Sequence, residues 1–332
     1  MNKQILVLNV GSSSFKWKLF SAQNLVELDS NSKNKLPLEK LLKSLSPNLK
    51  AIGHRIVHGG EKYFRETELN EEVISDLEKI SHLAPLHNPP AIETIKKCRT
   101  ILPNVSNYAV FDTSFFHYLP PKAYLYALPY ELYQKHGIRR YGFHGISHEY
   151  VSKEAAKKLR KPISKLNLIT VHLGQGASVT AIEQGKAVDT SMGFTPLEGL
   201  SMCTRSGDLD PAIIFYLVDQ LGYSISKVEQ LLYSQSGILG LSELSGDMRD
   251  ILSSKEEKAI LSIDVYCYRI RKYIGAYLAV LGNLDAVVFT GAIGFGSERI
   301  RKTVLKGFSQ LENIPVFPIE TNEELAIAQK II

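Results

Sequence analysis

Hydrophobic and polar residues follow each other in a pattern that predicts two similar hairpins of strands. In the first, the apolar run "ILVLNV" enters a Gly-Ser-Ser-Ser turn, and residues 15–19 then alternate apolar side chains with lysine. In the second, the apolar run 167–173 is turned by Gly-Gln-Gly and returns over 177–182, with one more strand in "EQGKAVDTS". Two hairpins of one kind, each heading one half of the chain, indicate an internal duplication.

Short apolar strands alternate with amphipathic helices over the rest of the chain, which is the pattern of an α/β protein. The helix expected at 70–83 opens on Asn70 as a cap and carries apolar residues at helical spacing. The other expected elements are strands at 51–57, 108–111 and 284–290, a glycine turn at 291–296, and helices from Pro89 onward, from the cap Ser147 onward, and at 211–221, 225–235, 256–281, 297–311 and 321–329.

The boundary between the two halves is expected near residue 147. This gives one domain of residues 1–147, to which a C-terminal helix 321–332 returns, and a second domain of residues 148–320. Polar residues gather at the ends of the apolar strands, and ligands of open α/β sheets bind at strand ends. The pattern therefore predicts a cleft between two duplicated domains, without naming its ligand.

The composition is that of an ordinary globular protein. Of the 332 residues, 44% are hydrophobic and 22% are charged, and the net charge is only +5. Because the lysines are spread along the chain, neither nucleic acid nor a membrane is an expected partner. The three cysteines lack CxxC spacing, which argues against disulfides and zinc. A cytoplasmic location is expected, because no signal-like or membrane-spanning run occurs.

Two arginines are candidates for holding an anion. Arg55 and Val57 lie on the same side of the strand in "GHRIVHGGE", so a guanidinium that grips a carboxylate or phosphate adjoins an apolar side chain that suits a small alkyl group. Arg205 lies among small residues in "TRSGD", where backbone and ligand can come close. The alternatives are an Arg55 that snorkels from a buried strand and an Arg205 in a plain exposed turn.

Three acidic or imidazole positions are also candidates. Asp112 follows a strand, where it either orients a nucleophile, binds Mg²⁺ or caps the next turn. His144 suits a hydrogen bond to a transferring group, or is structural; a metal pair with His148 is disfavoured, because Gly145 interrupts a helix between them. Glu323 and Glu324 suit the first turn of a helix, an interpretation that outweighs metal binding on sequence alone.

The usual phosphate-binding motifs are absent from the sequence. There is no GxxxxGK[ST], and no GxGxxG opens a helix. Phosphates must therefore be held in another way, and a pair of Gly/Ser hairpins is how the actin-like ATPase architecture holds them.

Motifs in a fixed order resemble those of acetate kinases. They are "LNVGSSSFK", "GHRIVHGGE", "LAPLHNPP", "VFDTSF", "RRYGFHGISH", "VHLGQGASV", "DTSMGFTPLEGL", "TRSGDLDP", "SGDMRDI", "FTGAIGFGS" and "TNEELAIA", spread over residues 5–329. The resemblance implies two duplicated actin-like ATPase (ribonuclease H-like) domains and reversible transfer of the ATP γ-phosphoryl to acetate, or to propionate. It also implies ADP as the other nucleotide, Mg²⁺ (with Mn²⁺ as a substitute) and a homodimer.

The resemblance also assigns roles, position by position. Asp112 matches the family's active-site aspartate, and His144 and Arg205 match its transition-state stabilisers. Asn9 and Glu323 match the metal site, with Glu324 as a neighbouring candidate. The acyl substrate site is matched by Arg55, Val57, Leu86, Phe143 and Pro196. The nucleotide contacts are matched by Lys16, His172, Leu173, Gly174, Gln175, Gly176, Asp247, Met248, Arg249, Ala292, Ile293, Gly294, Phe295 and Gly296.

The sequence departs from the family pattern mainly in the nucleotide loops. Gln175 replaces the usual Asn, Cys203 stands where Gly is usual, and Phe295-Gly296 replaces Glu-Asn; Phe116 takes a place commonly held by His. The chain is also shorter than most members, mainly between Phe20 and Ala51 and between Arg301 and Thr321. Two alternatives follow: an acyl kinase with another donor, such as pyrophosphate or a different nucleotide, and a non-catalytic ligand sensor. Cys203 is either a redox-sensitive thiol or a small buried residue.

Overall fold

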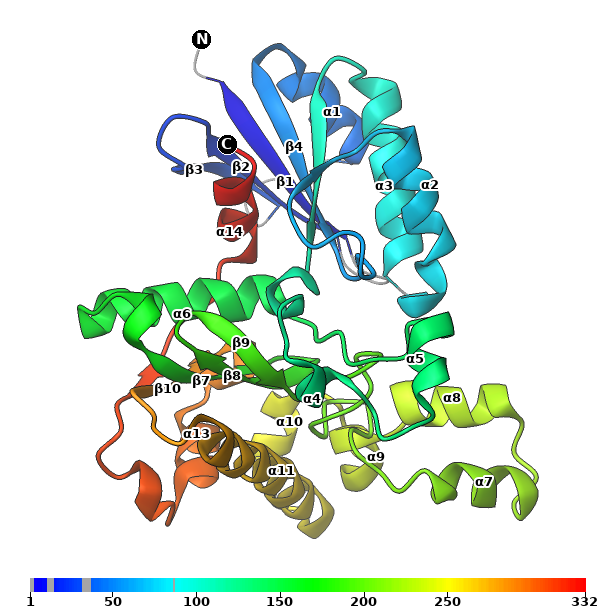
Figure 1. Cartoon of the computed structure of the whole chain (residues 1–332), viewed down its shortest axis with the longest axis vertical. Coiled ribbons are helices and arrows are strands. Elements are labelled where there is room, and N and C mark those ends of the chain that lie inside the picture. The colour runs from blue at the N-terminus through cyan, green and yellow to red at the C-terminus, as the bar shows by residue number, and fades with distance from the viewer. Residues whose placement is uncertain (1–2, 11–14, 32–36, 86) are drawn as a thin grey trace. The chain divides into compact units, whose positions relative to one another are not determined.

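The structure is a computed structural model that describes residues 3–10, 15–31, 37–85 and 87–332. The chain forms two compact units (Figure 1). Unit 1 comprises Met1–His117, Phe143–Tyr150 and Asn322–Ile332, and unit 2 comprises Tyr118–Gly142 and Val151–Thr321. Within the described residues, no helix has the length and apolar character needed to cross a membrane.

Unit 1 is built on a six-stranded sheet in the order β3-β2-β1-β4-β6-β5. The strand β1 pairs antiparallel with β2, which pairs antiparallel with β3, whereas β1, β4 and β6 run parallel to one another. The strands are β1 (Gln4–Val10), β2 (Phe15–Ser21), β3 (Glu27–Ser30), β4 (Leu49–Ile56), β5 (Thr67–Glu68) and β6 (Ser106–Phe111). The carboxyl ends of β1, β4 and β6 therefore lie at one edge of the sheet.

Helices cover both faces of this sheet, because alternate strand residues are apolar on both sides. On one face Leu6 and Leu8 pack with α1 (Leu38–Leu45) and α3 (Asn88–Ile101), while α2 (Glu71–Lys79) packs beside α3. On the other face Ile5 and Val7 pack with α14 (Glu323–Lys330) and the start of α6 (Gly145–Leu159). The result is a three-layer unit with buried apolar side chains on both faces of the sheet.

Unit 2 is built on a five-stranded sheet in the order β11-β10-β7-β8-β9. Again a first strand pairs antiparallel with the second, the second pairs antiparallel with the third, and the two later strands run parallel to the first. The strands are β7 (Asn167–Leu173), β8 (Ala177–Glu183), β9 (Lys186–Thr190), β10 (Ala286–Thr290) and β11 (Val316–Pro318). This is the order and direction of β1, β2, β3, β4 and β6, so the duplication expected from the two hairpins is confirmed in the topology.

The long helix α11 (Glu257–Leu281) packs against β7 and β8 in unit 2. Its buried residues include Ile263, Cys267, Ile270 and Ile274, which supports the core-packing interpretation of that helix face. The other helices of unit 2 are α4 (Pro121–Tyr124), α5 (Tyr130–His136), α7 (Ala212–Asp219), α8 (Ile225–Ser234), α9 (Gly237–Ser242), α10 (Met248–Ser253), α12 (Gly291–Gly296) and α13 (Glu298–Leu305).

Several expected elements differ from the structure in detail. The glycine turn expected at 291–296 is the short helix α12, and the helix expected over 297–311 ends at Leu305, with a separate 3-10 turn at Ser309–Leu311. The helix expected over 70–83 ends at Lys79, before a 3-10 turn. The helix expected to follow Ser147 begins at Gly145, so Gly145 does not interrupt it. The Gly-Ser-Ser-Ser turn lies outside the described residues.

Candidate active site

Three polar residues of unit 1 meet because their strands are parallel neighbours. Asn9 lies near the end of β1, Arg55 near the end of β4, and Asp112 directly after β6. The Nη1 atom of Arg55 donates to Asn9 Oδ1 at 3.1 Å, and its Nε donates to the Asp112 carboxylate at 3.1 Å. The sequence prediction that polar side chains converge at these strand ends is thus realised for this trio.

The start of α14 adds two carboxylates to the cluster. Asn322 caps the helix by accepting from Leu325 N–H, and Glu323 and Glu324 follow in the first turn. The amide nitrogen of Asn9 donates to Glu324 Oε1 at 3.1 Å and to Glu323 Oε2 at 3.5 Å. Sequence reasoning preferred Glu323, but Glu324 is the more buried of the two and the closer to Asn9.

Arg55 is held firmly and still has donors to offer. Its Nε and Nη2 atoms both donate to Asp112, and Glu323 Oε2 lies 3.8 Å from Nε. Among the described residues, one N–H on each terminal nitrogen is left for another acceptor, since a guanidinium carries five N–H groups. Burial alone would lower the pKa of Arg55, but Asp112 and Glu323 raise it overall. The guanidinium is therefore a permanent cation.

Asp112 is 1% exposed and directly tied to the loop that carries His144. Burial raises the pKa of Asp112, while the Arg55 guanidinium opposes part of that rise. Its backbone carbonyl accepts from Gly145 N–H at 2.9 Å, and a Cβ at Gly145 would lie only 2.2 Å from that oxygen. His144 itself has φ of +60°, a strained value for a residue with a side chain. The hydrogen bond of Gly145 therefore holds the backbone next to His144 against the backbone of Asp112.

Two apolar candidates of unit 1 are buried. Val57 follows β4 and is 7% exposed, and Phe143 is 1% exposed. The ring of His58, the residue after Val57, meets the Phe143 ring edge-on at 5.7 Å. Asn88 fixes the backbone of His58 by accepting from its N–H and donating to its carbonyl. Leu86, the other apolar candidate here, lies outside the described residues.

In unit 2, Arg205 is a half-buried cation without a carboxylate. Its Nη1 donates to the Pro196 carbonyl at 3.2 Å and approaches Met202 Sδ at 3.7 Å. In the part of the chain that the structure describes, no acidic side chain pairs with it. Burial lowers the pKa of Arg205, as expected for a cation removed from water. A cation in this state is stabilised by an anionic ligand.

The turn between β7 and β8 is fixed by the segment that precedes Arg205. Gly174 N–H donates to Gly176 O, and Cys203 N–H donates to Gln175 O at 3.3 Å. Gln175 is exposed. Burial raises the pKa of Cys203 to about 11. Its thiol is therefore neutral near pH 7, which favours the structural interpretation over a redox-sensitive one.

The remaining nucleotide candidates of unit 2 surround that turn. The helix α12 starts against β7, because a Cβ at Gly291 would lie 2.5 Å from Leu173 O. Gly246, just before α10, lies against the Thr204 side chain and the Cys203 carbonyl. Asp247 caps α10 and pairs with Arg249. His172, Leu173, Met248 and Gly294 are buried, Asp247 and Ile293 are half-buried, and Arg249, Ala292, Phe295 and Gly296 are exposed.

Lys16 and Phe116, two further positions singled out in the sequence, lie in different environments. Lys16 is exposed on β2, directly across from Asn9 in the strand register. Phe116 is 1% exposed and its ring packs against the rings of Phe115 and His148. Phe116 therefore fills core space in unit 1.

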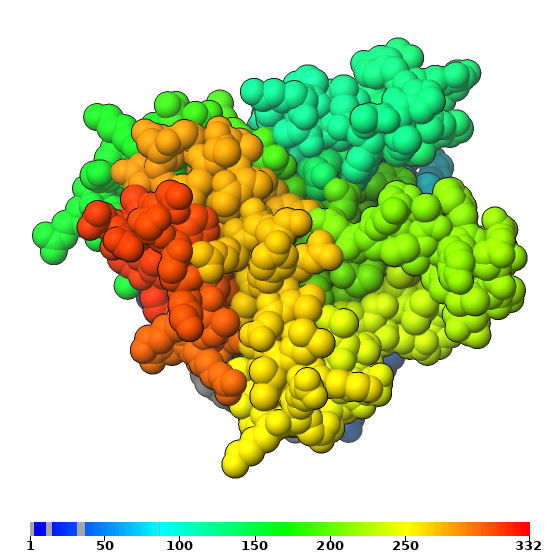
Figure 2. Space-filling view, turned by 90° about the horizontal axis from the view of Figure 1, so that it is seen from below, coloured from blue at the N-terminus to red at the C-terminus, as the bar shows by residue number. Residues whose placement is uncertain are grey.

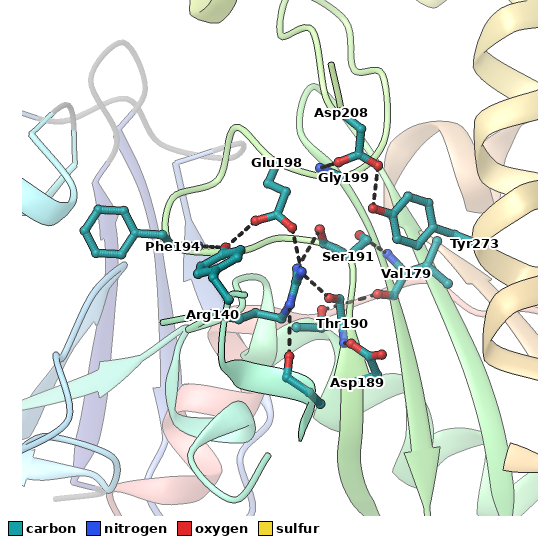
Figure 3. Close-up of polar contacts among 12 residues, drawn as sticks. Arg140, Val179, Asp189, Thr190, Ser191, Phe194, Glu198, Gly199, Asp208 and Tyr273 are labelled. Carbon is teal, nitrogen blue, oxygen red and sulfur yellow. Dashed lines mark hydrogen bonds and ion pairs between the residues drawn. The ribbon is translucent and has the colours of Figure 1, made fainter. Parts of the chain in front are cut away.

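Sequence reasoning missed a polar network in unit 2, shown in Figure 3. Glu198 accepts from the Arg140 Nη2 at 2.5 Å and from the Tyr126 hydroxyl, and the Tyr126 oxygen accepts from Phe194 N–H at 2.8 Å. Arg140 lies 58 residues before Glu198, and Tyr126 lies 72 residues before it, so no local sequence spacing reveals the network.

Comparison with known proteins places this fold among the acyl kinases. The crystal structure of Porphyromonas gingivalis acetate kinase matches with a TM-score of 0.89 at 36% identity, covering 98% of each chain. The structure of a propionate kinase from Francisella tularensis subsp. tularensis SCHU S4 matches with a TM-score of 0.90 at 37% identity, covering 99% of this chain and 98% of that one. The fold expected from the sequence is therefore confirmed.

Sequence comparison narrows this class to one family. The acetokinase family profile matches residues 31–314. The acetate kinase of Shewanella sp. (strain ANA-3) is 45% identical over 389 aligned positions, covering 99% of this chain and 98% of that protein. The chain belongs to the acetokinase family. Because 389 positions exceed the 332 residues present here, the relative has segments that this chain lacks.

Proposed function

We propose that the protein is an acetate kinase, which reversibly transfers the γ-phosphoryl of ATP to acetate and gives acetyl phosphate and ADP. The observation that carries this proposal is Arg205, a half-buried cation with no carboxylate partner among the described residues. A guanidinium so placed is suited to the oxygens of a phosphoryl group in transfer. The family relationship supports the same reaction.

The reaction asks little of a general base. Acetate is already ionised near pH 7, since carboxyl groups have pKa values of about 4. The obstacle is repulsion between this anion and the phosphates of ATP, so fixed positive charge aimed at the transferring group supplies most of the catalysis. Arg205 and His144 are the protein groups that we assign to this role.

Arg55 is assigned to the acceptor. One N–H on each terminal nitrogen is left after the bonds to Asp112 and Asn9, and these donors suit the oxygens of acetate or acetyl phosphate. Val57 and Phe143 are the buried apolar residues proposed to meet the methyl group, with Leu86 and Pro196 assigned by family resemblance. Asp112 holds Arg55 in place and keeps it charged.

Propionate is a second acyl substrate that the proposal includes. The Francisella tularensis structure of similar fold is named a propionate kinase. One additional methylene in an apolar pocket changes specificity by about 1–3 kcal/mol, so a pocket for acetate does not strictly exclude propionate.

The residues around Asn9 suit a magnesium ion. Mg²⁺ prefers oxygen ligands and commonly takes one or two carboxylates, with water and substrate phosphates completing its shell. The Glu323 and Glu324 carboxylates are oxygen donors that both contact the Asn9 amide nitrogen, while the Asn9 amide oxygen accepts from Arg55. When bound, Mg²⁺ or Mn²⁺ would neutralise phosphate charge. Glu323 and Glu324 hold it in this proposal, and Asn9 orients both carboxylates.

The nucleotide is assigned to unit 2. We propose that Gly174, Gln175 and Gly176 offer backbone to the phosphates, and that Asp247, Arg249 and α12 contact the nucleoside. Lys16 is assigned to the nucleotide by the family resemblance alone. Gln175 and Phe295 are exposed and differ from the usual family residues. A changed phosphoryl donor, such as pyrophosphate or another nucleotide, is therefore the second candidate function.

Trapping of acyl phosphate as hydroxamate tests the proposal. Purified protein is incubated with ATP, Mg²⁺ and acetate, propionate or butyrate, and we expect product with acetate and less with longer acids. The reverse reaction with acetyl phosphate and ADP, GDP or inorganic phosphate identifies the donor. Product from none of the acids with any donor, together with thermal stabilisation by acetate or ATP, would replace the kinase with a ligand sensor.

A homodimer is also proposed, and α7 supports it. No residue of α7 is buried, and Ile213, Phe215 and Tyr216 are 45%, 65% and 58% exposed. The α7 segment lies at the margin of unit 2, in yellow-green in Figure 2. Apolar groups gathered on one short helix are typical of an association surface. Sedimentation of a Phe215→Glu variant, with Lys302→Glu as control, is expected to show a monomer only for the former.

A further inference from the structure

The segment that supplies the Pro196 carbonyl to Arg205 is held by side chains outside the candidate active site. It runs from Ser191, just after β9, to Gly199, and contains no helix or strand. Its backbone bonds must therefore be made with side chains or with other segments. Contacts that fix this segment therefore also fix the Pro196 carbonyl, which accepts a hydrogen bond from Arg205.

One end of the segment is fixed by the ion pair of Arg140 and Glu198. The Nη1 atom of Arg140 donates to the carbonyls of Thr190 and Ser191 at 3.0 and 3.2 Å, while Nη2 donates to Glu198 (Figure 3). Burial alone would lower the pKa of Arg140, but Glu198 raises it overall. The pair therefore stays ionised and joins residue 198 to residues 190 and 191.

Tyr126 closes this arrangement over Gly193. Its hydroxyl donates to Glu198 and accepts from Phe194 N–H. Burial, followed by the nearby Glu198 charge, raises the pKa of Tyr126, so the hydroxyl keeps its proton. A Cβ at Gly193 would lie 1.6 Å from Glu198 Oε2 and 2.1 Å from the Tyr126 oxygen. The backbone passes directly against the ion pair, so a side chain at position 193 would displace the Glu198 carboxylate or the Tyr126 hydroxyl.

The other end of the segment is fixed by Asp208. Its Oδ1 accepts from Gly199 N–H at 2.8 Å and its Oδ2 accepts from the Tyr273 hydroxyl at 2.6 Å. Its own N–H donates to Gly199 O. Thr195, Pro196 and Leu197 thus form a short span between two fixed ends, and the Pro196 carbonyl in this span accepts from Arg205 at 3.2 Å.

We propose that Tyr126, Arg140 and Glu198 are positioning residues for the phosphoryl-transfer step. They set the place of the Pro196 carbonyl and, through it, the place of the Arg205 guanidinium. Glu198 itself is paired with Arg140 and does not pair with Arg205. The inference rests on the proposed function, because it assigns a purpose to the position of Arg205.

A positioning role makes a prediction that a purely structural role does not. Loss of the network should displace Arg205 and lower kcat, because catalytic groups lose efficiency when displaced by about 1 Å. The KM for ATP should stay within about twofold, since the Gly174–Gly176 turn is held by Cys203 instead. A variant that is only less stable keeps its kcat at temperatures where it is folded.

The test is a double-mutant cycle in the hydroxamate assay between Glu198→Ala and Arg205→Ala. Glu198→Ala alone is expected to lower kcat at least tenfold, and to lower it by less than twofold when Arg205 is already alanine. The proposal is overturned if the kcat reductions of the two single variants multiply in the double variant. It is also overturned if folded Glu198→Ala keeps the wild-type kcat. If that variant does not fold, Tyr126→Phe, which removes one hydroxyl, takes its place in the cycle with the same criteria.

The controls separate this inference from the function on which it rests. Glu131→Gln removes a carboxylate from an exposed ion pair with Lys135 in the same unit and is expected to keep the wild-type kcat. Thermal unfolding of each variant establishes that it is folded at the assay temperature. Absence of acyl phosphate with wild-type protein would reject the kinase function itself, whereas an active wild type with multiplying effects rejects only the positioning role.

Discussion

Arg55 and Asp112 form a buried ion pair in which both Nε and Nη2 of the guanidinium donate to one carboxylate. The pair fills one edge of the guanidinium and turns its remaining donors to other acceptors. A lysine at this position carries the same charge but lacks the planar guanidinium with its paired N–H donors. It therefore cannot bind Asp112 and a ligand in the same way.

Replacement of Arg55 by lysine is therefore expected to lower kcat/KM for acetate about a hundredfold, which is roughly 3 kcal/mol of transition-state stabilisation. Steady-state kinetics with varied acetate measures the effect. The exposed Arg65, replaced in the same way, is the control in unit 1. Equal kcat/KM in the Arg55→Lys variant and wild type would contradict the role assigned to Arg55.

Removal of Arg205 should affect the chemical step rather than nucleotide binding. We expect Arg205→Ala to lower kcat by about 10² to 10³, the usual effect of losing one transition-state donor. The dissociation constant for ADP, measured by calorimetry, should change little. Lys302→Ala on α13, which removes an exposed cation of the same unit, serves as the matched variant. A normal kcat in Arg205→Ala would remove the main support for the proposed function.

The metal assignment is testable by binding alone. Glu323→Gln is expected to weaken Mn²⁺ affinity in the presence of ADP by about tenfold, because a ligand or its close neighbour loses its charge. Electron paramagnetic resonance of free Mn²⁺ measures this without any turnover. The Glu320→Gln variant, which changes an exposed residue three positions earlier, should bind Mn²⁺ with the wild-type affinity. Unchanged affinity in Glu323→Gln, with weakened affinity in Glu324→Gln, would remove Glu323 from the proposed site and leave Glu324 as its ligand.

His54 gives unit 1 a predictable pH dependence of stability. It is 2% exposed and its Nε2 lies 2.8 Å from Asn107 Oδ1. Asn107 Nδ2 donates to Val105 O, so Oδ1 is the acceptor and neutral His54 is the donor. Burial lowers the pKa of His54 from 6.5 to about 4, against a smaller opposing effect of the Asn107 bond.

Because the unfolded chain takes up the proton first, His54 weakens the folded state as pH falls from 6.5 to about 4. The loss is at most about 3 kcal/mol, at 1.36 kcal/mol per pH unit. Urea unfolding of wild type and His54→Gln at pH 7.0, 5.5 and 4.5 isolates the contribution of His54 to the free energy of unfolding, because all other groups titrate in both proteins. We expect a flatter pH profile for His54→Gln, and parallel profiles would refute the assignment.

Two glycines of unit 2 should respond to alanine in opposite ways. Gly193→Ala places a methyl group 1.6 Å from Glu198 Oε2 and is expected to cost several kcal/mol of unfolding free energy. Gly275→Ala lies within α11 with its nearest neighbour 3.7 Å away, and should stabilise the protein by about 0.5–1 kcal/mol. Thermal unfolding compares the two, and a neutral Gly193→Ala would contradict the described packing.

The parts of the fold that were predictable are those that local patterns specify. Apolar runs, together with the alternation of apolar residues and lysine over residues 15–19, predicted the strands of both hairpins. The cap Asn70 with its apolar period predicted the start of α2. The helix α12 was missed because "GAIGFG" has low helix propensity, and its conformation depends on packing of Gly291 against Leu173. Tertiary contacts outweigh local preference there.

The same division applies to the site. The convergence of Arg55 and Asp112 was predictable because both residues lie at the ends of apolar strands, whereas their roles in the site stay a prediction. The partnership of Glu198 with Tyr126 was not, because 72 residues separate them and both look like ordinary surface residues in sequence. Gly145 was misjudged as a helix breaker, since only the structure reveals the carbonyl of Asp112 against which it packs.

The contact between Asn9 and Glu324 spans 315 positions of the chain. During synthesis on the ribosome, β1 and β4 emerge early, yet α14, which packs against both, follows only after nearly all of the intervening chain has been made. Such distant pairing is slow to form. Nascent chains that stop before α14 would therefore lack two carboxylates beside Arg55, which delays assembly of this cluster until α14 itself has been made.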